Sequence, residues 1–416
     1  MALPTRRGTA LLFTALGTYM AARLVGTWEL YLVALALGAA VLVAWVLVAV
    51  TARGLEGERT VSPERPIAGD PVSTGLRVAN GSILPGVQLT VPDPASGLGH
   101  GRGELHVESL GPHGRRWVTS RPEPARRGVH FLPALRARAE DPLGLAGAER
   151  RLGDPLEVTV HPKLVHLSSC VLWPDMGTRH ERGRRGHAML GAADFRGVRP
   201  HNPGEPLSHI DWKSTAKTGE LMLREMDDPA SGEVTVLLDA STALVVGDPP
   251  DTNFERAVQV AGSIADFALR AGRGVSLLLP EDQWRPARLT PGVAGRERLR
   301  DALARVAPRQ GHVSASLRTL LGAPGKRRRT PIVALVVLAL DSELAHAAVA
   351  LRRLGMQVSV IHVTATAAEE PLPAEARDLS LALAASGVSC LTVHRDDDLH
   401  AALSSTASDA RRAVFR

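Results

Sequence analysis

Residues 30–50 read LYLVALALGAAVLVAWVLVAV, an uncharged run of 21 residues. A helix of this length crosses the ~30 Å hydrocarbon core of a bilayer. A second uncharged stretch, 9–22, lies just before it and reaches spanning length if it continues past Arg23. Trp28 stands in the polar turn between the two runs, where an aromatic side chain suits the headgroup level. The N-terminus therefore predicts an anchor, residues 1–56, made of two transmembrane helices.

The alternative for the first run is a signal peptide, because two arginines precede an apolar stretch. We favour the helical hairpin, since the longer run follows so closely. Positive charge flanks the hairpin on both sides, at Arg6, Arg7, Arg53 and Arg59, whereas the turn has only Arg23, offset by Glu29. The positive-inside rule then predicts a multi-pass protein of the cell membrane with its soluble domains in the cytoplasm.

The composition excludes some functions. The formal net charge is +6, but aromatic residues make up only 3%, and single-stranded nucleic-acid binding needs aromatic side chains beside basic ones. We therefore expect surplus arginine on solvated faces and no nucleic-acid partner. The two cysteines, Cys170 and Cys390, predict neither a disulfide framework nor a cysteine metal site.

Residues 57–165 have short alternating runs such as 87–91 and 156–160, punctuated by Gly, Pro, Asn and Asp. Regularly spaced short strands with turn residues between them predict an all-β, sandwich-like domain. Three histidines at 100, 106 and 113 could form a metal site, although solvated loop histidines explain them more simply.

Residues 166–232 form a connector. Its basic, glycine-broken loop could dock an acidic partner or anionic lipid, or could simply be solvated, and its cations are Arg179, Arg182, Arg184 and Arg185. The following stretch, 194–217, combines charged groups with Trp212 and a Pro-Gly turn. We interpret it as an ion-pair network that closes one face of the next domain.

Residues 233–416 alternate apolar strands with amphipathic helices, which predicts an α/β, doubly wound, Rossmann-type parallel sheet. The strand 233–238 ends at Asp239, and the strand 332–340 ends at Asp341. Ligands bind such sheets at the carboxyl ends of strands where the winding reverses, so Asp239, Ser241 and Asp341 are candidate ligands of a hard cation such as Mg²⁺. The alternative is that Asp239 and Ser241 only cap the next helix.

The segment Asp239-Ala240-Ser241-Thr242-Ala243 resembles the D-x-S-x-S motif of von Willebrand factor A domains, and Asp341 resembles their later aspartate. The resemblance implies a metal-ion-dependent adhesion site. Ala243 replaces one hydroxyl ligand, and no threonine matches the family's threonine ligand. We therefore expect a degenerate site with weak Mg²⁺ binding, millimolar or poorer, or with none.

The whole chain is similar to bacterial membrane proteins called "domain of unknown function 58". The signatures are 80–82, 127–130, 141–145 and the connector residues Arg199, Gly204, Glu205, Ile210, Asp211, Trp212, Ser214, Ala216 and Lys217. The departures from the family motif are His201, Glu205 and Ser208. The resemblance implies a MoxR-type AAA+ ATPase as partner, a transglutaminase-like membrane protein as a further one, and a role in complex assembly or envelope maintenance.

Neither a G-x-S-x-G nor an H-E-x-x-H motif occurs. Gly325-Lys326 resembles a phosphate loop only superficially, because Arg327 follows where a Ser or Thr is needed. We therefore expect a membrane-anchored, non-catalytic binding or adaptor protein. Two alternatives remain: a hydrolase of unknown substrate, and an extracytoplasmic adhesion module if the topology is inverted.

Overall fold

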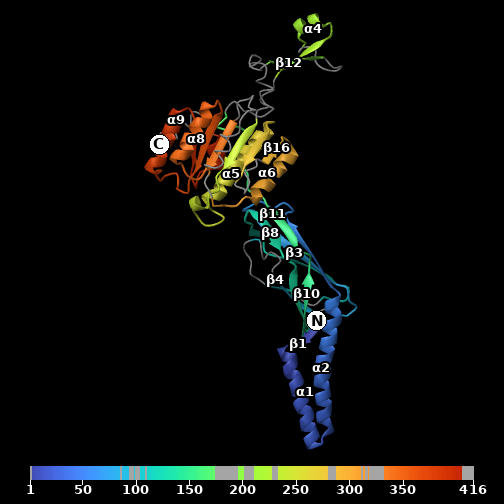
Figure 1. Cartoon of the computed structure of the whole chain (residues 1–416). Coiled ribbons are helices and arrows are strands. Elements are labelled where there is room, and N and C mark those ends of the chain that lie inside the picture. Colours follow the sequence, from blue (N-terminus) through green and yellow to red (C-terminus); the bar gives the residue numbers. More distant parts are fainter. Residues whose placement is uncertain are drawn as a thin grey trace. The chain divides into compact units, whose positions relative to one another are not determined.

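The computed structural model describes residues 2–84, 87–92, 98, 104–107, 110–173, 195–200, 210–226, 233–279, 287–310, 313, 317 and 332–404. The chain divides into two compact units, Met1–His161 and Pro162–Arg416. Figure 1 shows the two units, with the N-terminal helices in blue and the C-terminal sheet in yellow to red. Each unit is described by itself below.

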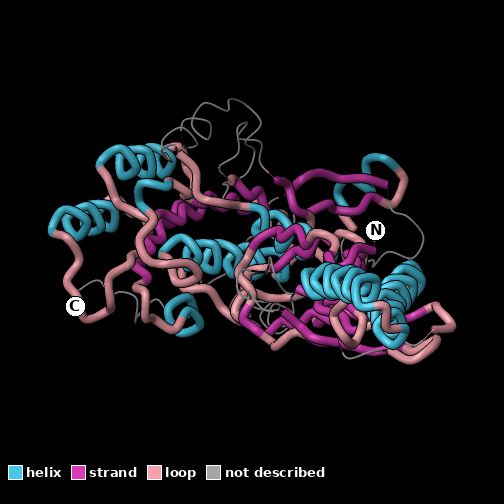
Figure 2. Tube along the Cα trace, turned by 90° about the horizontal axis from the view of Figure 1, so that it is seen from below, coloured by secondary structure: helices cyan, strands magenta, loops and turns pink. Residues whose placement is uncertain are grey.

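The first unit begins with the short strand β1 (Ala2–Pro4) and two long helices, α1 (Arg6–Val25) and α2 (Trp28–Arg53). Both helices are long and apolar enough to cross a membrane. Thr5 caps the start of α1, and Gly26 ends it in the left-handed conformation, at a φ of 77°. The two helices lie side by side in Figures 1 and 2. The prediction of two long apolar helices at the N-terminus is confirmed.

The rest of the first unit is built from strands. A five-stranded sheet has the order β1-β10-β9-β4-β5, a second sheet has the order β2-β3-β6 with β7 on β3, and β11 pairs with β8. The strands are β2 (Leu55–Ser62), β3 (Pro71–Asn80), β4 (Gln88–Pro92), β5 (Glu104–Val107), β6 (Arg115–Thr119), β7 (Glu123–Pro124), β8 (Gly128–Leu132), β9 (Leu135–Glu140), β10 (Ala146–Leu152) and β11 (Leu156–Val160). Their described pairings are all antiparallel.

One apolar core joins α2 to the sheets. Its helical members are Val41, Ala44, Val48 and Ala52, and its strand members come from both larger sheets, among them Leu76, Leu89 and Ala137. Two of the four helical members are alanines, and small side chains allow a strand to approach a helix closely. The second half of α2 is therefore packed against the β-strands, and the structure groups the predicted anchor with the β region.

The second unit contains a six-stranded sheet of order β16-β15-β14-β17-β18-β19. The pairs are parallel except β15–β16, which is antiparallel. The strands are β14 (Val234–Leu238), β15 (Val275–Leu278), β16 (Ala287–Leu289), β17 (Ile332–Val337), β18 (Gln357–Val363) and β19 (Ser389–Val393). Strands β14 and β17 are buried almost throughout, as expected of strands covered on both faces.

Helices cover the two faces of this sheet. Helix α5 (Asn253–Arg270) contributes Phe254, Ile264 and Phe267 to a core on one face, together with residues of α6 (Val293–Arg305). Helices α8 (Ser342–Arg353) and α9 (Ala374–Ala385) contribute to a separate core on the other face. The last helix is α10 (Leu399–Ser404). The expectation of a sheet-rich body with helices is confirmed.

Candidate functional site

The carboxyl edge of the six-stranded sheet holds the predicted cation ligands. Strands β14 and β17 are neighbours at the centre of the sheet, with Leu238 in register with Val336. After β14 the chain forms β15 on one side of it and then crosses to form β17 on the other side. The winding direction therefore switches between β14 and β17. The loop after β14, which begins at Asp239, thus lies at the position where open α/β sheets bind ligands.

The buried carboxylate of Asp239 accepts two backbone hydrogen bonds. Its Oδ1 accepts from the Ser241 amide at 3.0 Å, and its Oδ2 accepts from the Leu338 amide at 3.3 Å. The first bond closes a local turn, whereas the second reaches the segment after β17, 99 residues along the chain. Asp239 therefore fastens the ends of two adjacent strands.

The rest of the loop is fixed by backbone contacts. The Arg309 amide donates to the Ala240 carbonyl at 2.7 Å, and the Thr242 amide donates to the Arg309 carbonyl at 2.9 Å. A single 3₁₀ turn, η3 (Thr242–Leu244), follows. The Asn253 side chain then binds the Val246 amide and the Leu244 carbonyl, both at 2.9 Å, which joins the loop to the start of α5.

Asp341 has a different role. Strand β17 ends at Val337, three residues earlier than the apolar run suggests, and Asp341 is the exposed N-cap of α8. Its Oδ1 accepts from the Leu344 amide at 2.7 Å. Within the described ranges, no group of three or more His, Cys, Asp or Glu side chains is placed to hold a metal. The geometry gives both carboxylates backbone partners, and weak or absent Mg²⁺ binding stays a prediction.

Two histidines at this edge are residues that the sequence analysis missed. His362, the last residue but one of β18, is 5% exposed, and His394 directly follows the neighbouring strand β19. The Nδ1 atoms of both rings are buried with no hydrogen-bond partner in the described part of the chain. The pKa of His362 is lowered to about 4, chiefly by burial and also by the nearby His394, while a backbone hydrogen bond at Leu338 acts in the opposite direction. His362 is therefore a neutral imidazole at physiological pH.

An acidic loop, 396–398, lies beside this pair. Arg256 of α5 donates to the Asp397 backbone carbonyl, and the Asp397 carboxylate accepts from the His394 amide at 2.7 Å. Burial lowers the pKa of the Arg256 guanidinium, and the three nearby aspartates raise it. These contacts fix the loop that carries His394.

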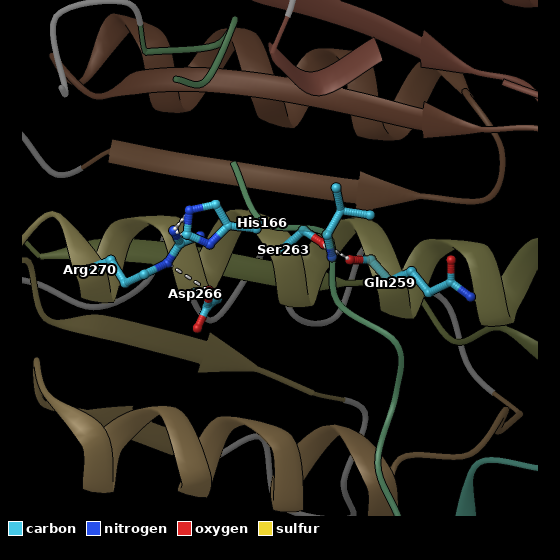
Figure 3. A network of polar contacts seen from close by, with 6 residues as sticks. His166, Gln259, Ser263, Asp266 and Arg270 are labelled. Carbon is cyan, nitrogen blue, oxygen red and sulfur yellow. Dashed lines mark hydrogen bonds and ion pairs between the residues drawn. The ribbon is translucent and has the colours of Figure 1, made fainter. Parts of the chain in front are cut away.

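A second polar network holds the start of the unit against α5, as Figure 3 shows. Ser263 Oγ accepts from the Val165 amide at 2.9 Å and donates to the Gln259 carbonyl at 2.7 Å. Arg270 pairs with Asp266 at 2.8 Å and contacts the ring of His166. The Val165 and His166 contacts join the incoming segment to α5, and the Arg270–Asp266 pair lies within α5, so the network holds the segment in place.

The family motif of the connector forms a small folded element. Strand β12 (Phe195–Pro200) pairs with β13 (Met222–Met226), and helix α4 (Trp212–Thr218) lies between them in sequence. The buried Asp211 caps α4, because its Oδ1 accepts from the amides of Lys213 and Ser214, both at 3.1 Å. Thr215 accepts from the Met222 amide at 3.0 Å, which joins helix to strand.

The connector residues named from the sequence, as family-motif positions or as partner-binding arginines, lie in different surroundings. Trp212, the first residue of α4, is 68% exposed, and Lys213, Ala216 and Lys217 are exposed on the same short helix. Ile210 is buried and Ser214 is half-buried, while Arg199 lies in β12. The remaining predicted residues, Arg179, Arg182, Arg184, Arg185, Gly204 and Glu205, lie outside the described residues.

Comparisons with known proteins find a relative and several solved structures that are similar to parts of this chain. The "Uncharacterized protein YeaD" of Bacillus subtilis (strain 168) is 30% identical over 175 residues, which cover 39% of this chain and 39% of that protein. Two solved structures have low TM-scores. A CARDB domain of Pyrococcus furiosus is 16% identical at a TM-score of 0.18, covering 26% of this chain and 86% of that one. A GH20 exo-β-N-acetylglucosaminidase of Vibrio harveyi is 10% identical at 0.20, covering 82% and 81%.

These TM-scores assign no fold. The family comparison reaches further, because residues 197–412 match the family described as "Protein of unknown function DUF58". The matched range begins in β12, includes α4 with its exposed Trp212 and the whole six-stranded sheet, and ends beyond α10. Since the match covers more than half of the chain, this protein belongs to the DUF58 family.

Proposed function

We propose that this protein is a membrane-anchored, non-catalytic adaptor that recruits a protein partner through the connector motif. The observation that carries the proposal is Trp212. Asp211 and Thr215 hold α4 in place by hydrogen bonds, yet the indole of Trp212 stays 68% exposed. A large aromatic side chain that a hydrogen-bonded helix holds exposed to solvent is typical of an anchor residue in a protein interface.

The partner is an acidic protein surface. Lys213 and Lys217 are exposed beside Trp212 on α4, so the helix presents an aromatic anchor with two cations. Exposed cations steer association with an acidic surface and make it sensitive to salt. The family resemblance points to a MoxR-type AAA+ ATPase as that partner, and the role is assembly of protein complexes or maintenance of the envelope.

The anchor is a membrane-crossing hairpin. Strand β1 precedes α1 and pairs with β10, which follows α2 by more than 90 residues. An even number of crossings returns the chain to the side where it began, so this pairing supports two transmembrane helices over a cleaved leader. Arg6, Arg7 and Arg53 flank the hairpin and support a cytoplasmic location of the soluble domains.

The second unit is a von Willebrand A-like domain. In chain order its strands are arranged 3-2-1-4-5-6 with the third antiparallel, which supports the A-like, Rossmann-type assignment. Ala243 in the place of a ligand, and the backbone partners of Asp239 and Asp341, support a degenerate Mg²⁺ site.

The test measures binding of the full chain, reconstituted in nanodiscs, to a purified MoxR-type AAA+ ATPase. Trp212→Ala should weaken binding at least about tenfold, as expected for an interface anchor. The matched control is Trp117→Ala, because Trp117 is also exposed, at 54%, but lies in β6 of the first unit. Equal binding by both variants and wild type would remove the docking role of α4. Hydrolase activity of the purified protein would favour the enzyme alternative.

A further inference from the structure

The turn 141–145 between β9 and β10 is docked against the first turn of α1. The Thr5 amide donates to the Leu145 carbonyl at 2.9 Å, and the Thr5 hydroxyl donates to the Gly144 carbonyl. Gly8 lies so close to Leu145 that a Cβ there would overlap the Leu145 carbonyl oxygen. A Cβ on Gly144 would lie 3.5 Å from Nη1 of Arg7. The turn is thus held at the end of α1 where the apolar helix begins.

Within this turn, two leucines face opposite environments. Leu145 is buried in the core that α2 shares with the sheets, whereas Leu143 is 67% exposed. The backbone around Leu143 is not loose. The buried carboxylate of Asp141 accepts from the Leu143 amide at 2.9 Å and from the Ala146 amide at 2.6 Å, and Gly144 adopts a left-handed φ of 65°. A rigid turn therefore presents an apolar side chain outward.

Other groups suited to a membrane interface surround the same place. Leu3 of β1 is exposed and pairs with Gly147, next to the turn. The Trp45 indole of α2 donates to the Ala2 carbonyl at 3.1 Å, and tryptophan is enriched at the headgroup level. Arg6 and Arg7 are exposed in the first turn of α1, where guanidinium groups can contact lipid phosphates.

We propose that the turn 141–145 is a third membrane contact, which inserts Leu143 into the boundary between headgroups and acyl chains beside α1. The occupant is the bilayer itself, because the turn is continuous with the hairpin surface that crosses it. The inference rests on the proposed membrane anchor. With this contact, the β-strands of the first unit lie against the membrane rather than extend freely from it. Arg6 and Arg7 then contact the lipid phosphates.

The test places single spin labels on the full chain reconstituted in phosphatidylcholine–phosphatidylglycerol vesicles. The labelled variants are Leu143→Cys, Leu16→Cys in the middle of α1, and Phe131→Cys. Phe131 is the matched control because it is 66% exposed, nearly the same as Leu143, but lies in β8 at the end of the unit away from the hairpin (Figure 1). Burial raises the pKa of Cys170 and of Cys390 to about 11, so both native thiols react slowly near neutral pH.

The readout is the collision rate of each label with oxygen, which concentrates in lipid, relative to a water-soluble nickel chelate. We expect this ratio to be at least about threefold higher at position 143 than at position 131, and highest at position 16. If position 16 is in lipid but 143 resembles 131, the third contact is refuted while the anchor stands. If position 16 is itself in water, the anchor fails and the third contact fails with it.

Discussion

Two buried aspartates, one in each unit, both accept hydrogen bonds from backbone amides, but they connect different parts of the chain. Asp141 in the first unit accepts from amides two and five residues ahead of it, at 2.9 and 2.6 Å. Asp239 in the second unit accepts from an amide two residues ahead and from Leu338, 99 residues away, at 3.0 and 3.3 Å. The first carboxylate therefore shapes one turn, and the second fastens two strands. The difference teaches that a buried carboxylate at the end of a strand need not be a metal ligand, because backbone amides can satisfy it.

The largest expected effect is that of the Asp141 carboxylate on the stability of the turn 141–145. Asp141→Ala leaves two amides without partners, each costing roughly 1–3 kcal/mol, so we expect the turn to open more easily by about 4 kcal/mol. Hydrogen exchange of residues 141–147 measures this. Asp154→Ala, which changes an exposed aspartate of the same unit, is the control. Unchanged protection in Asp141→Ala would show that the turn does not depend on its carboxylate.

The stability of the carboxyl edge of the six-stranded sheet should fall at acidic pH. The pKa of His362 is lowered to about 4, below its ordinary value of 6.5, so the unfolded chain takes up a proton before the folded one does. The stability of β18 should therefore be fully present above pH 6.5 and fall by up to about 3 kcal/mol as the pH approaches 4. Hydrogen exchange of β18, corrected for the intrinsic rate at each pH, follows this change.

The variant His362→Gln should lose most of this pH dependence. His400→Gln, at an exposed histidine of α10, should keep it. The same slope in both variants would assign the effect to other groups, with the neighbouring His394 as the first to test.

The docking of the turn 141–145 on α1 can be disrupted from the side of the helix. Gly8→Ala introduces a Cβ that overlaps the Leu145 carbonyl, so the first turn of α1 must move away, at about 2 kcal/mol. Gly17→Ala is the matched control in the same helix, because nothing lies within 4 Å of a Cβ there. Hydrogen exchange of the Thr5 amide, which donates to Leu145, should accelerate only in Gly8→Ala. Equal effects of the two variants would contradict the docking.

The smallest effect is expected where one acceptor is kept. Asp239→Asn retains an oxygen for one amide but presents an NH₂ group to the other, so the strands β14 and β17 should separate more easily by about 1 kcal/mol. Exchange of the Leu338 amide measures it. Calorimetric titration with Mg²⁺ adds an independent check: micromolar affinity in wild type that Asp239→Asn abolishes would overturn the degenerate-site interpretation.

Hydropathy and periodicity predicted much of the fold. The two long helices follow from the uncharged runs 9–22 and 30–50, and the strand β14 lies within the predicted strand 233–238. The sequence pattern did not predict the shortest strands, because three residues are too few to show a period. Examples are β1 and the antiparallel edge strand β16. The packing of α2 on the sheets was not predicted either, because apolar side chains such as Val41 and Val48 can face lipid or a protein core equally well.

The candidate site was harder to predict for reasons of register. Asp239 could be placed at the sheet edge because it ends an apolar run, but the run 332–340 hides the fact that β17 stops at Val337. Asp341 therefore belongs to the helix that follows. His362 and His394 come together only because β18 and β19 pair in one particular register. A histidine within an otherwise apolar strand was the signal available in the sequence.

The pairing of β1 with β10 sets an order of events during synthesis. Residue 2 leaves the ribosome long before residue 148, its partner in the sheet. The edge of β10 is completed only after both long helices, and most of the β-strands of the first unit, have been made. The proposed insertion of the hairpin into the membrane can therefore begin before β1 pairs with β10. A fusion placed directly before Ala2 would have to let this strand dock, which makes the C-terminal side the better place for a tag.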